Sequence, residues 1–347
     1  MVTRIAVTGA AGMLGSHLVE RLAGRGHDVV GVDLRPAEQP VPGARHELAD
    51  VRDTSRLRQL FDGLDVVVHT ASALPSYPVE QIRSVIVDGT GSVLAAAGAA
   101  RVGRVVHISS TAVYGLPSVV PTTERYPREP VDPYSRAKAE AEVICERHRA
   151  EGLCLPILRP KTFLGPGRMG LFAMLFEWAE QGRHFPVLGR GDVRIQMLAM
   201  PDLLDAVESV LRAEPEVAND TYNIAAADFG TLAQDFQAVL DAAGHGKRVI
   251  GMPAAPALAV LRVLQAVRLS PVYGRLLHKL RADSYVSIEH AAARLGYQPK
   301  LSNRDAILQT YAWWRGQRQS TTAPRTGGRT SRDPWRQGVL GLARHFF

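Results

Sequence analysis

A tyrosine and a lysine four residues apart are the side chains in this sequence best suited to proton transfer. Tyr134 and Lys138 lie in Asp132-Pro-Tyr-Ser-Arg-Ala-Lys138, and on a helix this spacing places both on one face. A phenol with a pKa of about 10 is a poor base at neutral pH, and lowering that pKa to about 7 takes about 4 kcal/mol of preferential stabilisation of the phenolate. A lysine ammonium one turn along supplies part of it. Such pairs also arise by chance, so the pair needs support from other residues.

That support comes from hydroxyl groups in His107-Ile-Ser109-Ser110-Thr111-Ala-Val-Tyr114-Gly115. They follow a short apolar run, and ligands of open α/β sheets bind at the carboxyl ends of strands. A hydroxyl there can polarise a substrate oxygen, although serines after a strand are often only turn or cap residues. We expect Ser110 to act with Tyr134 and Lys138, and Thr111 and Tyr114 to meet the substrate.

Three glycines follow the first apolar run, in Val7-Thr-Gly9-Ala-Ala-Gly12-Met-Leu-Gly15. Glycine permits a sharp turn at Gly9, lets backbone N–H groups approach a pyrophosphate at Gly12 and allows close packing of helix on strand at Gly15. The spacing is G-x-x-G-x-x-G and differs from the G-x-G-x-x-G fingerprint. It predicts a dinucleotide site. The residues expected there are Gly9, Gly12, Met13, Leu14 and Gly15.

Asp33 ends the second predicted strand, about 20 residues past the glycines, where a carboxylate accepts hydrogen bonds from the adenosine ribose. A carboxylate repels a 2′-phosphate, so we expect NAD, although Arg35 could offset that repulsion and keeps NADP open. Asp50 follows a third predicted strand and could meet the adenine amino group. The expected adenosine contacts are Asp33, Leu34, Arg35, Asp50 and Val51.

The elements that position these residues alternate between apolar runs and amphipathic stretches, which is typical of βαβ units in a parallel sheet. We predict strands at Ile5–Thr8, Val29–Val32, Val66–Thr70, Val105–Ser109 and Leu155–Leu158, and helices at Gly12–Gly24, Ser55–Phe61, Val85–Ala100 and Pro133–Glu151. The fold class is therefore α/β, a Rossmann-type doubly wound parallel sheet over residues 1–160 that carries the catalytic residues.

After Pro160 the pattern is less regular and predicts a smaller α+β, substrate-binding part over residues 161–315, with some chain returning to the Rossmann core. The predicted elements there are helices at Leu171–Gln181, Leu203–Arg212, Leu232–Ala243, Pro256–Ala266, Ile288–Leu295 and Arg304–Arg315, and strands at Val193–Leu198 and Thr221–Ile224. Residues 316–347 read as a basic, disordered tail.

Composition excludes several classes of partner. Six arginines and one aspartate in residues 316–347 account for five of the seven net positive charges, so the rest of the chain is close to neutral and we expect no nucleic-acid partner. Cys145 and Cys154 form no metal-binding spacing, and we expect no metal. No secretory signal is visible and Arg262 and Arg268 interrupt the apolar stretch 253–269, so we expect a cytoplasmic protein without a membrane span.

Taken together, these motifs resemble the extended short-chain dehydrogenase/reductase family of NAD-dependent epimerases and dehydratases, over about residues 2–314. The residues that carry the resemblance are Thr8 to Gly15, Asp33, Asp50-Val51, His69-Thr-Ala-Ser72, Ser109 to Gly115, Tyr134 to Lys138 and Arg159 to Gly167. One position departs, because Ile86 stands where the family often has asparagine before Gly89-Thr90.

The resemblance implies roles for these residues. Ser110 would orient the substrate hydroxyl, Tyr134 would remove or return its proton, and Lys138 would lower the tyrosine pKa and hold the nicotinamide ribose. It also implies a homodimer through the helices at Val85–Ala100 and Pro133–Glu151. The remaining residues that would line the cofactor are Thr70, Ala71, Ser72, Ser109 and Pro160.

The family's dehydratases and decarboxylases place acidic residues directly after the catalytic hydroxyl, where this chain has Thr111-Ala112. Oxidation–reduction or epimerisation at a secondary alcohol or ketone therefore remains. We expect a nucleotide sugar, whose diphosphate would meet Lys161, Arg168, Arg194 and Gln196. Thr162 departs from many sugar-nucleotide members, which leaves open a hydrophobic substrate, as for 3-beta-hydroxysteroid dehydrogenases or dihydroflavonol reductases. A non-catalytic, dinucleotide-binding regulatory protein is the alternative of another class.

Overall fold

A parallel sheet forms the centre of the larger part of the molecule. The computed structural model describes residues 2–167, 172–253 and 282–320 of the chain. Within them the sheet has seven strands in the order β10-β6-β5-β4-β1-β2-β3, all of whose pairings are parallel. The strands are β1 (Arg4–Thr8), β2 (Asp28–Asp33), β3 (Ala44–Leu48), β4 (Val66–His69), β5 (Arg104–Ile108), β6 (Ile157–Pro160) and β10 (Thr221–Ile224). The predicted Rossmann-type fold class is confirmed.

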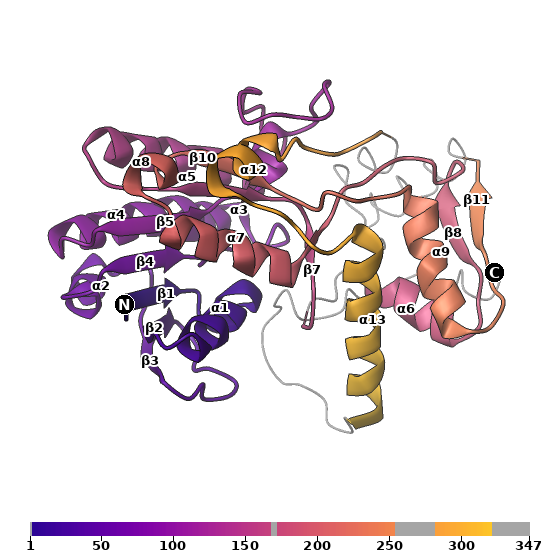
Figure 1. Cartoon of the computed structure of the whole chain (residues 1–347), viewed down its shortest axis with the longest axis horizontal. Helices are drawn as coiled ribbons and strands as arrows, with labels where there is room; N and C mark the ends of the chain where they lie inside the picture. Colours follow the sequence, from indigo (N-terminus) through magenta and orange to yellow (C-terminus); the bar gives the residue numbers. More distant parts are fainter. Residues whose placement is uncertain (1, 168–171, 254–281, 321–347) are drawn as a thin grey trace.

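Both faces of the sheet are covered, which explains why its central strands are apolar throughout. One core lies between the sheet and the helices α1 (Met13–Gly24) and α7 (Met200–Arg212). The other lies under α2 (Thr54–Phe61), α4 (Gly89–Ala99) and α5 (Pro133–Ala150). Figure 1 shows these layers, with the smaller part of the molecule beside them.

The helix predicted at Val85–Ala100 differs from the observed one. The helical stretch starts earlier, with α3 (Val79–Arg83), and passes through one π-helical turn at Ser84–Asp88 before α4. Gly89 lies at this change of geometry, where a Cβ would come within 2.9 Å of Val51 Cγ2. The wide turn therefore lets α4 approach the loop after β3 closely, and a count of apolar periodicity does not detect it.

The smaller part has its own core of aromatic and aliphatic side chains. Its elements are α6 (Phe172–Glu180), α9 (Leu232–Ala243), α13 (Asn303–Ser320) and two short parallel pairs, β8 (Phe185–Leu188) with β11 (Val249–Met252) and β7 (Phe163–Leu164) with β9 (Leu198–Ala199). The predicted strand Val193–Leu198 is wrong, because only Leu198 of that range is in a strand. The strands β8 and β11 are absent from the prediction because each is four residues long and contains a residue that disfavours a strand, Pro186 or Gly251.

The chain crosses back to the sheet in this half. Strand β10 falls at the predicted residues and pairs with β6, and α8 (Pro215–Ala218) and α12 (Glu289–Leu295) pack near it. Helix α13 continues to Ser320, so the predicted boundary at residue 316 is five residues too early. The predicted helix Pro256–Ala266 and residues 321–347 lie outside the described residues. No helix in the described ranges has the length and apolarity needed to cross a membrane.

Candidate active site

A cleft of about 590 Å³ opens at the carboxyl ends of the central strands. It is lined by residues that directly follow β1, β2, β4, β5 and β6, which is where parallel sheets bind ligands. Every residue predicted for the cofactor lines it, and so do Ser110, Thr111 and Lys161. The structure therefore collects into one cavity residues as far apart in the sequence as Gly9 and Lys161.

The glycine turn at one end of the cleft has no room for side chains. Gly9 has a φ of +74°, and a Cβ there would lie 2.7 Å from the Ala71 backbone. A Cβ on Gly15 would lie 2.1 Å from the Gly9 carbonyl oxygen. Backbone N–H groups at the start of α1 are thus exposed to the cleft at close range, which fits the pyrophosphate of a dinucleotide.

Asp33 is held rigidly at the end of β2. Its Oδ2 accepts a hydrogen bond from Ala11 N at 3.0 Å, and its Oδ1 accepts one from Arg35 N at 3.0 Å. The Arg35 guanidinium is near as well, with Nε 3.8 Å from Asp33 Oδ1. The carboxylate thus joins the glycine turn to β2, in the position of a ribose-binding group.

Asp50 lines the same end of the cleft and pairs with Arg52 at 2.5 Å and 2.9 Å. This hydrogen-bonded pair lowers the pKa of the Asp50 carboxyl. Val51 beside it is buried. The adenosine end of the cleft therefore carries two fixed carboxylates.

Helix α5 brings Tyr134 and Lys138 to the other end of the cleft. It begins with Asp132, whose side chain accepts from Ser135 N at 2.7 Å in a capping box, and with Pro133 in the first turn. The Lys138 side chain is buried, and its ammonium donates to the Ile108 carbonyl oxygen at 2.9 Å. Burial lowers the pKa of Lys138 to about 8, against the opposing charge of Glu142.

The two serines after β5 have different surroundings. Ser110 caps the short 3₁₀ helix Thr111–Tyr114, with Oγ accepting from Ala112 N at 3.1 Å, and it lines the cleft. Ser109 is buried and donates its hydroxyl to Glu142 Oε1 at 2.5 Å. Both serines line the cleft, but the Ser109 hydroxyl is donated to Glu142 inside the protein, whereas that of Ser110 accepts only from the backbone of its own turn among the contacts above.

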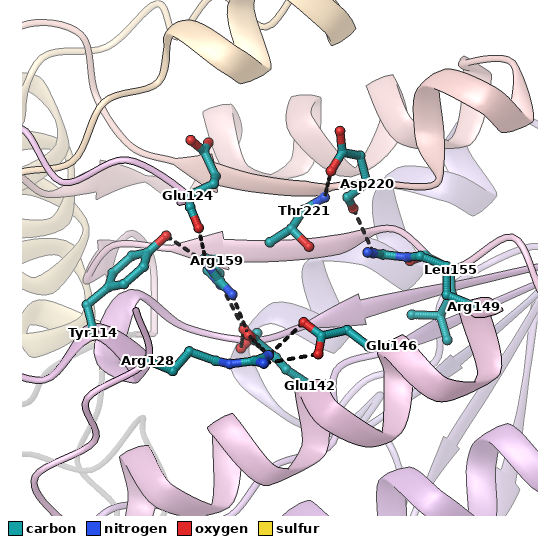
Figure 2. A network of polar contacts seen from close by, with 11 residues as sticks. Tyr114, Glu124, Arg128, Glu142, Glu146, Arg149, Leu155, Arg159, Asp220 and Thr221 are labelled. Atoms are coloured by element: carbon teal, nitrogen blue, oxygen red, sulfur yellow. Dashed lines mark hydrogen bonds and ion pairs between the residues drawn. The ribbon is translucent and has the colours of Figure 1, made fainter. Parts of the chain in front are cut away.

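Figure 2 shows a polar network that includes Tyr114, Arg159 and Glu142. The Tyr114 hydroxyl donates to Asn223 Oδ1 at 2.8 Å and accepts from Arg159 Nη1 at 2.8 Å. Burial raises the pKa of Tyr114 to about 12. Tyr114 lies outside the lining of the main cleft but lines a small adjoining cavity with Thr111 and Lys161, so its predicted substrate contact stays a prediction.

Three of the predicted diphosphate contacts, Lys161, Arg194 and Gln196, each bond Ser284, but of these three Lys161 alone lines the cleft. Gln196 is buried and bonds the Ala226 carbonyl oxygen and Val286 N, so it holds chain segments together. The Arg194 guanidinium stacks over the rings of Phe229 and Tyr285, at 4.8 Å and 5.1 Å from their centroids, and does not line the cleft. Lys161 does line it and donates to Ser284 Oγ at 2.9 Å. Arg168 lies outside the described residues.

Sequence reasoning missed some of the lining and its support. The segment after β4 adds an apolar wall to the cleft, for which the sequence carries no motif. Two buried histidines, His69 and His107, lie beneath Lys138 with ring centroids 5.5 Å apart. The sequence signal for these two residues is a histidine inside each of the apolar strands β4 and β5. The apolar wall consists of Leu74, Pro75, Tyr77 and Val85.

Comparisons with known proteins agree with this geometry. The family model described as "NAD dependent epimerase/dehydratase family" matches residues 5–225. The chain is 33% identical to the uncharacterized protein y4nG of Sinorhizobium fredii, over 97% of this chain and 84% of that one. It is 28% identical to a UDP-glucose 4-epimerase of Mycolicibacterium smegmatis, over 91% of this chain and 100% of that one.

A second activity occurs among the relatives. A 3 beta-hydroxysteroid dehydrogenase/Delta 5→4-isomerase of Mycobacterium tuberculosis is 26% identical, over 90% of each chain. A solved UDP-glucose 4-epimerase of Thermotoga maritima superposes with a TM-score of 0.75 at 21% identity, over 90% of this chain and 99% of that one, which is a likeness of fold. The chain thus belongs to the NAD-dependent epimerase/dehydratase family, as an enzyme whose cofactor is NAD.

Proposed function

We propose that this enzyme transfers a hydride at a secondary alcohol or ketone of a nucleotide sugar, as an epimerase or oxidoreductase. The observation that carries the proposal is that Ser110, Tyr134 and Lys138 line one cleft with every residue expected to hold the cofactor. A non-catalytic binding protein has no need for an acid–base set placed beside the cofactor.

Each of the three residues has a separate task in this proposal. The Tyr134 phenol takes the proton from the substrate hydroxyl and returns it in the reverse direction. The Lys138 ammonium, held by Ile108, favours the phenolate by its charge. The Ser110 hydroxyl bonds the substrate oxygen and fixes the carbon that reacts. NAD, when bound, supplies the hydride acceptor.

A nucleotide sugar fits the charge of the cleft. Among its described lining residues the carboxylates Asp33 and Asp50 and the guanidinium of Arg35 lie at the expected adenosine end, whereas the part with the catalytic residues carries the lysines Lys138 and Lys161 and no carboxylate. Positive charge there favours an anionic substrate such as a sugar diphosphate. The 28% identical UDP-glucose 4-epimerase supports the same choice.

A hydrophobic alcohol or ketone is the second candidate. The wall of Leu74, Pro75, Tyr77 and Val85, with Phe163 across the cleft, offers apolar contact that a sugar does not need. The 26% identical hydroxysteroid dehydrogenase is the relative that favours it.

We also propose a homodimer through α5 and the helical stretch that begins at Val79. Val79 is 59% exposed, and α3 and α5 pack side by side, so one helical face is open to a second copy. A monomer by light scattering across the working concentration range contradicts this arrangement.

The first experiment identifies the cofactor that the protein retains. The protein is purified without added cofactor and denatured, and any released dinucleotide is identified by chromatography with mass detection. Stoichiometric NAD favours an epimerase that recycles its hydride, and an empty protein that binds NAD reversibly favours a dehydrogenase or reductase. Binding of neither NAD nor NADP contradicts the proposal.

The second experiment tests the substrate class and the base. UDP-glucose and a 3β-hydroxysteroid are each added to the NAD-loaded protein, reduced nicotinamide is followed by absorbance, and the epimerised or oxidised product is followed by chromatography, because an epimerase that recycles its hydride accumulates no reduced nicotinamide. Conversion of UDP-glucose alone supports the nucleotide sugar, and conversion of the steroid alone supports the second candidate. Tyr134→Phe should abolish turnover and leave NAD binding nearly unchanged, whereas equal activity in that variant rules Tyr134 out as the base.

A further inference from the structure

Glu142 is a fully buried carboxylate one helical turn beyond Lys138 on α5. Its Oε1 accepts hydrogen bonds from Ser109 Oγ at 2.5 Å and Arg159 Nε at 2.9 Å. Its Oε2 accepts from Arg159 Nη2 at 2.6 Å and from Arg128 Nη1 at 3.2 Å (Figure 2). Four donors, two of them from one guanidinium, surround this carboxylate, which is the pairing that a buried negative charge requires.

Among the described residues, the other titratable groups that act on the charge of Lys138 are neutral. From β4 and β5 come the imidazoles of His69 and His107, and burial together with the charge of Lys138 holds the pKa of both rings well below its usual range. From α5 comes the Cys145 thiol, whose pKa is raised by burial, so it is neutral as well. The Ile108 carbonyl oxygen accepts from the ammonium. Among these neighbours Glu142 is the one that carries a negative charge.

The charge on Glu142 opposes the effect of burial on Lys138. Burial lowers the pKa of Lys138 and the carboxylate of Glu142 raises it, which leaves it at about 8. Lys138 lowers the pKa of Tyr134 only while the ammonium is protonated. Any loss of negative charge at Glu142 therefore acts on the proton-transfer step without touching substrate or cofactor.

The same carboxylate also joins three elements that carry the site. Ser109 precedes Ser110 at the end of β5, and Arg159 precedes Pro160, which lines the cleft at the end of β6. Arg159 in turn bonds Tyr114 at the end of the 3₁₀ helix that Ser110 caps. Glu142 lies where α5, β5 and β6 meet.

We propose that Glu142 is a positioning residue of the reaction: held by Arg159, its negative charge keeps the buried Lys138 ammonium protonated beside Tyr134. The proposal rests on the proposed function only through the role of Lys138. It concerns an equilibrium of the protein itself, so its test requires no substrate.

The small number of lysines makes the test direct. The chain has five, and isotope-labelled lysine side chains give five NMR signals that single lysine-to-arginine variants assign. We titrate the Lys138 signal in the NAD-free protein and in its Glu142→Gln, Glu142→Asp and Glu146→Gln variants. Glu146 is the matched control because it lies one turn further along α5 and also bonds Arg128. Unlike Glu142, its side chain is 42% exposed, and within the described residues it bonds neither Arg159 nor Ser109.

Glu142→Gln should lower the pKa of Lys138 by about one unit or more, because it removes the opposing charge and leaves Arg159 uncompensated. Glu142→Asp should keep that pKa close to the wild-type value even if it lowers stability, because it keeps the charge. Glu146→Gln should leave it unchanged. If Glu142→Gln does not fold, the E142Q/R159Q double variant removes both buried charges and is expected to show a downward shift that is smaller, because no uncompensated Arg159 charge remains.

An unchanged Lys138 pKa in the folded Gln variant, or equal shifts in the Gln and Asp variants, overturns the proposal and leaves the proposed function standing. In the opposite case, a shifted Lys138 pKa with no turnover of either substrate class sustains the role of Glu142 on Lys138 and counts against the proposed function. For the active enzyme, turnover should decline as the pH is raised, and in Glu142→Gln this decline should begin at a lower pH than in the wild type. NAD affinity should change little.

Discussion

Thr8 and His69 face each other across β1 and β4, with Thr8 Oγ1 and His69 Nδ1 2.7 Å apart. The other ring nitrogen, Nε2, lies 3.2 Å from Thr90 Oγ1, and that hydroxyl donates its proton to the Ile86 carbonyl oxygen. Thr90 therefore accepts from His69 Nε2–H, and Nδ1 accepts from the Thr8 hydroxyl. A neutral His69 thus ties the strand before the glycine turn to helix α4.

This arrangement predicts acid sensitivity. Burial lowers the pKa of His69 to about 3 from 6.5, so between these values the unfolded chain binds a proton that the folded chain does not. The contribution of the neutral His69 ring to stability is present in full above pH 6.5 and is lost as the pH falls toward 3. His69→Gln should lower the free energy of unfolding at neutral pH and weaken its dependence on pH in this window, as measured by urea unfolding. An equally steep dependence in the variant would exclude His69 as a cause.

Substitution of His107 should have the opposite effect on the free energy of unfolding. It is buried, and neither ring nitrogen has a hydrogen-bond partner among the described residues. A buried polar group without a partner costs about 1–3 kcal/mol. His107→Leu should therefore raise the free energy of unfolding, and more so at mildly acidic pH, because the pKa of His107 is held well below its usual value. A loss of stability at all pH values contradicts this prediction.

We expect Asp33 to determine whether the protein prefers NAD or NADP. Its carboxylate, fixed by Ala11 N and Arg35 N, repels a 2′-phosphate. Asp33→Ser should lower NAD affinity by about tenfold, the effect of one hydrogen bond to a charged group, and should raise NADP affinity. Arg35→Ala is the companion variant, in which NADP binding should become weaker still. Calorimetric titration with both dinucleotides measures the effects, and unchanged selectivity in Asp33→Ser removes Asp33 as the selector.

Two glycines of helix α1, Gly15 and Gly24, should respond differently to substitution by alanine. Gly15→Ala places a methyl group 2.1 Å from the Gly9 carbonyl oxygen and should greatly weaken NAD binding and lower the melting temperature. Gly24 ends the same helix, and a Cβ there has no atom within 4 Å. Gly24→Ala should stabilise the fold by about 0.5–1 kcal/mol and leave NAD binding unchanged. Similar behaviour of the two variants in thermal unfolding and NAD titration contradicts a steric role for Gly15.

Much of the cofactor end of the site can be predicted from the order of residues along the chain. Gly9, Asp33, Thr70 and Ser110 each follow a short apolar run, and the carboxyl ends of parallel strands meet at one edge of a sheet. The pattern of strands is local, so the position of these residues in the cleft follows from it. The same local signal places Tyr134 and Lys138 on one helical face.

The support behind the site depends on contacts between distant parts of the chain. Tyr114 bonds Asn223, which is 109 positions away, and Gln196 bonds Val286, which is 90 away, so both polar side chains are used in buried hydrogen bonds within the protein. Their residue types are compatible with either role. A buried polar group needs a hydrogen-bond partner. For these two side chains the partner is distant in the sequence, so only the tertiary structure shows that they can be buried.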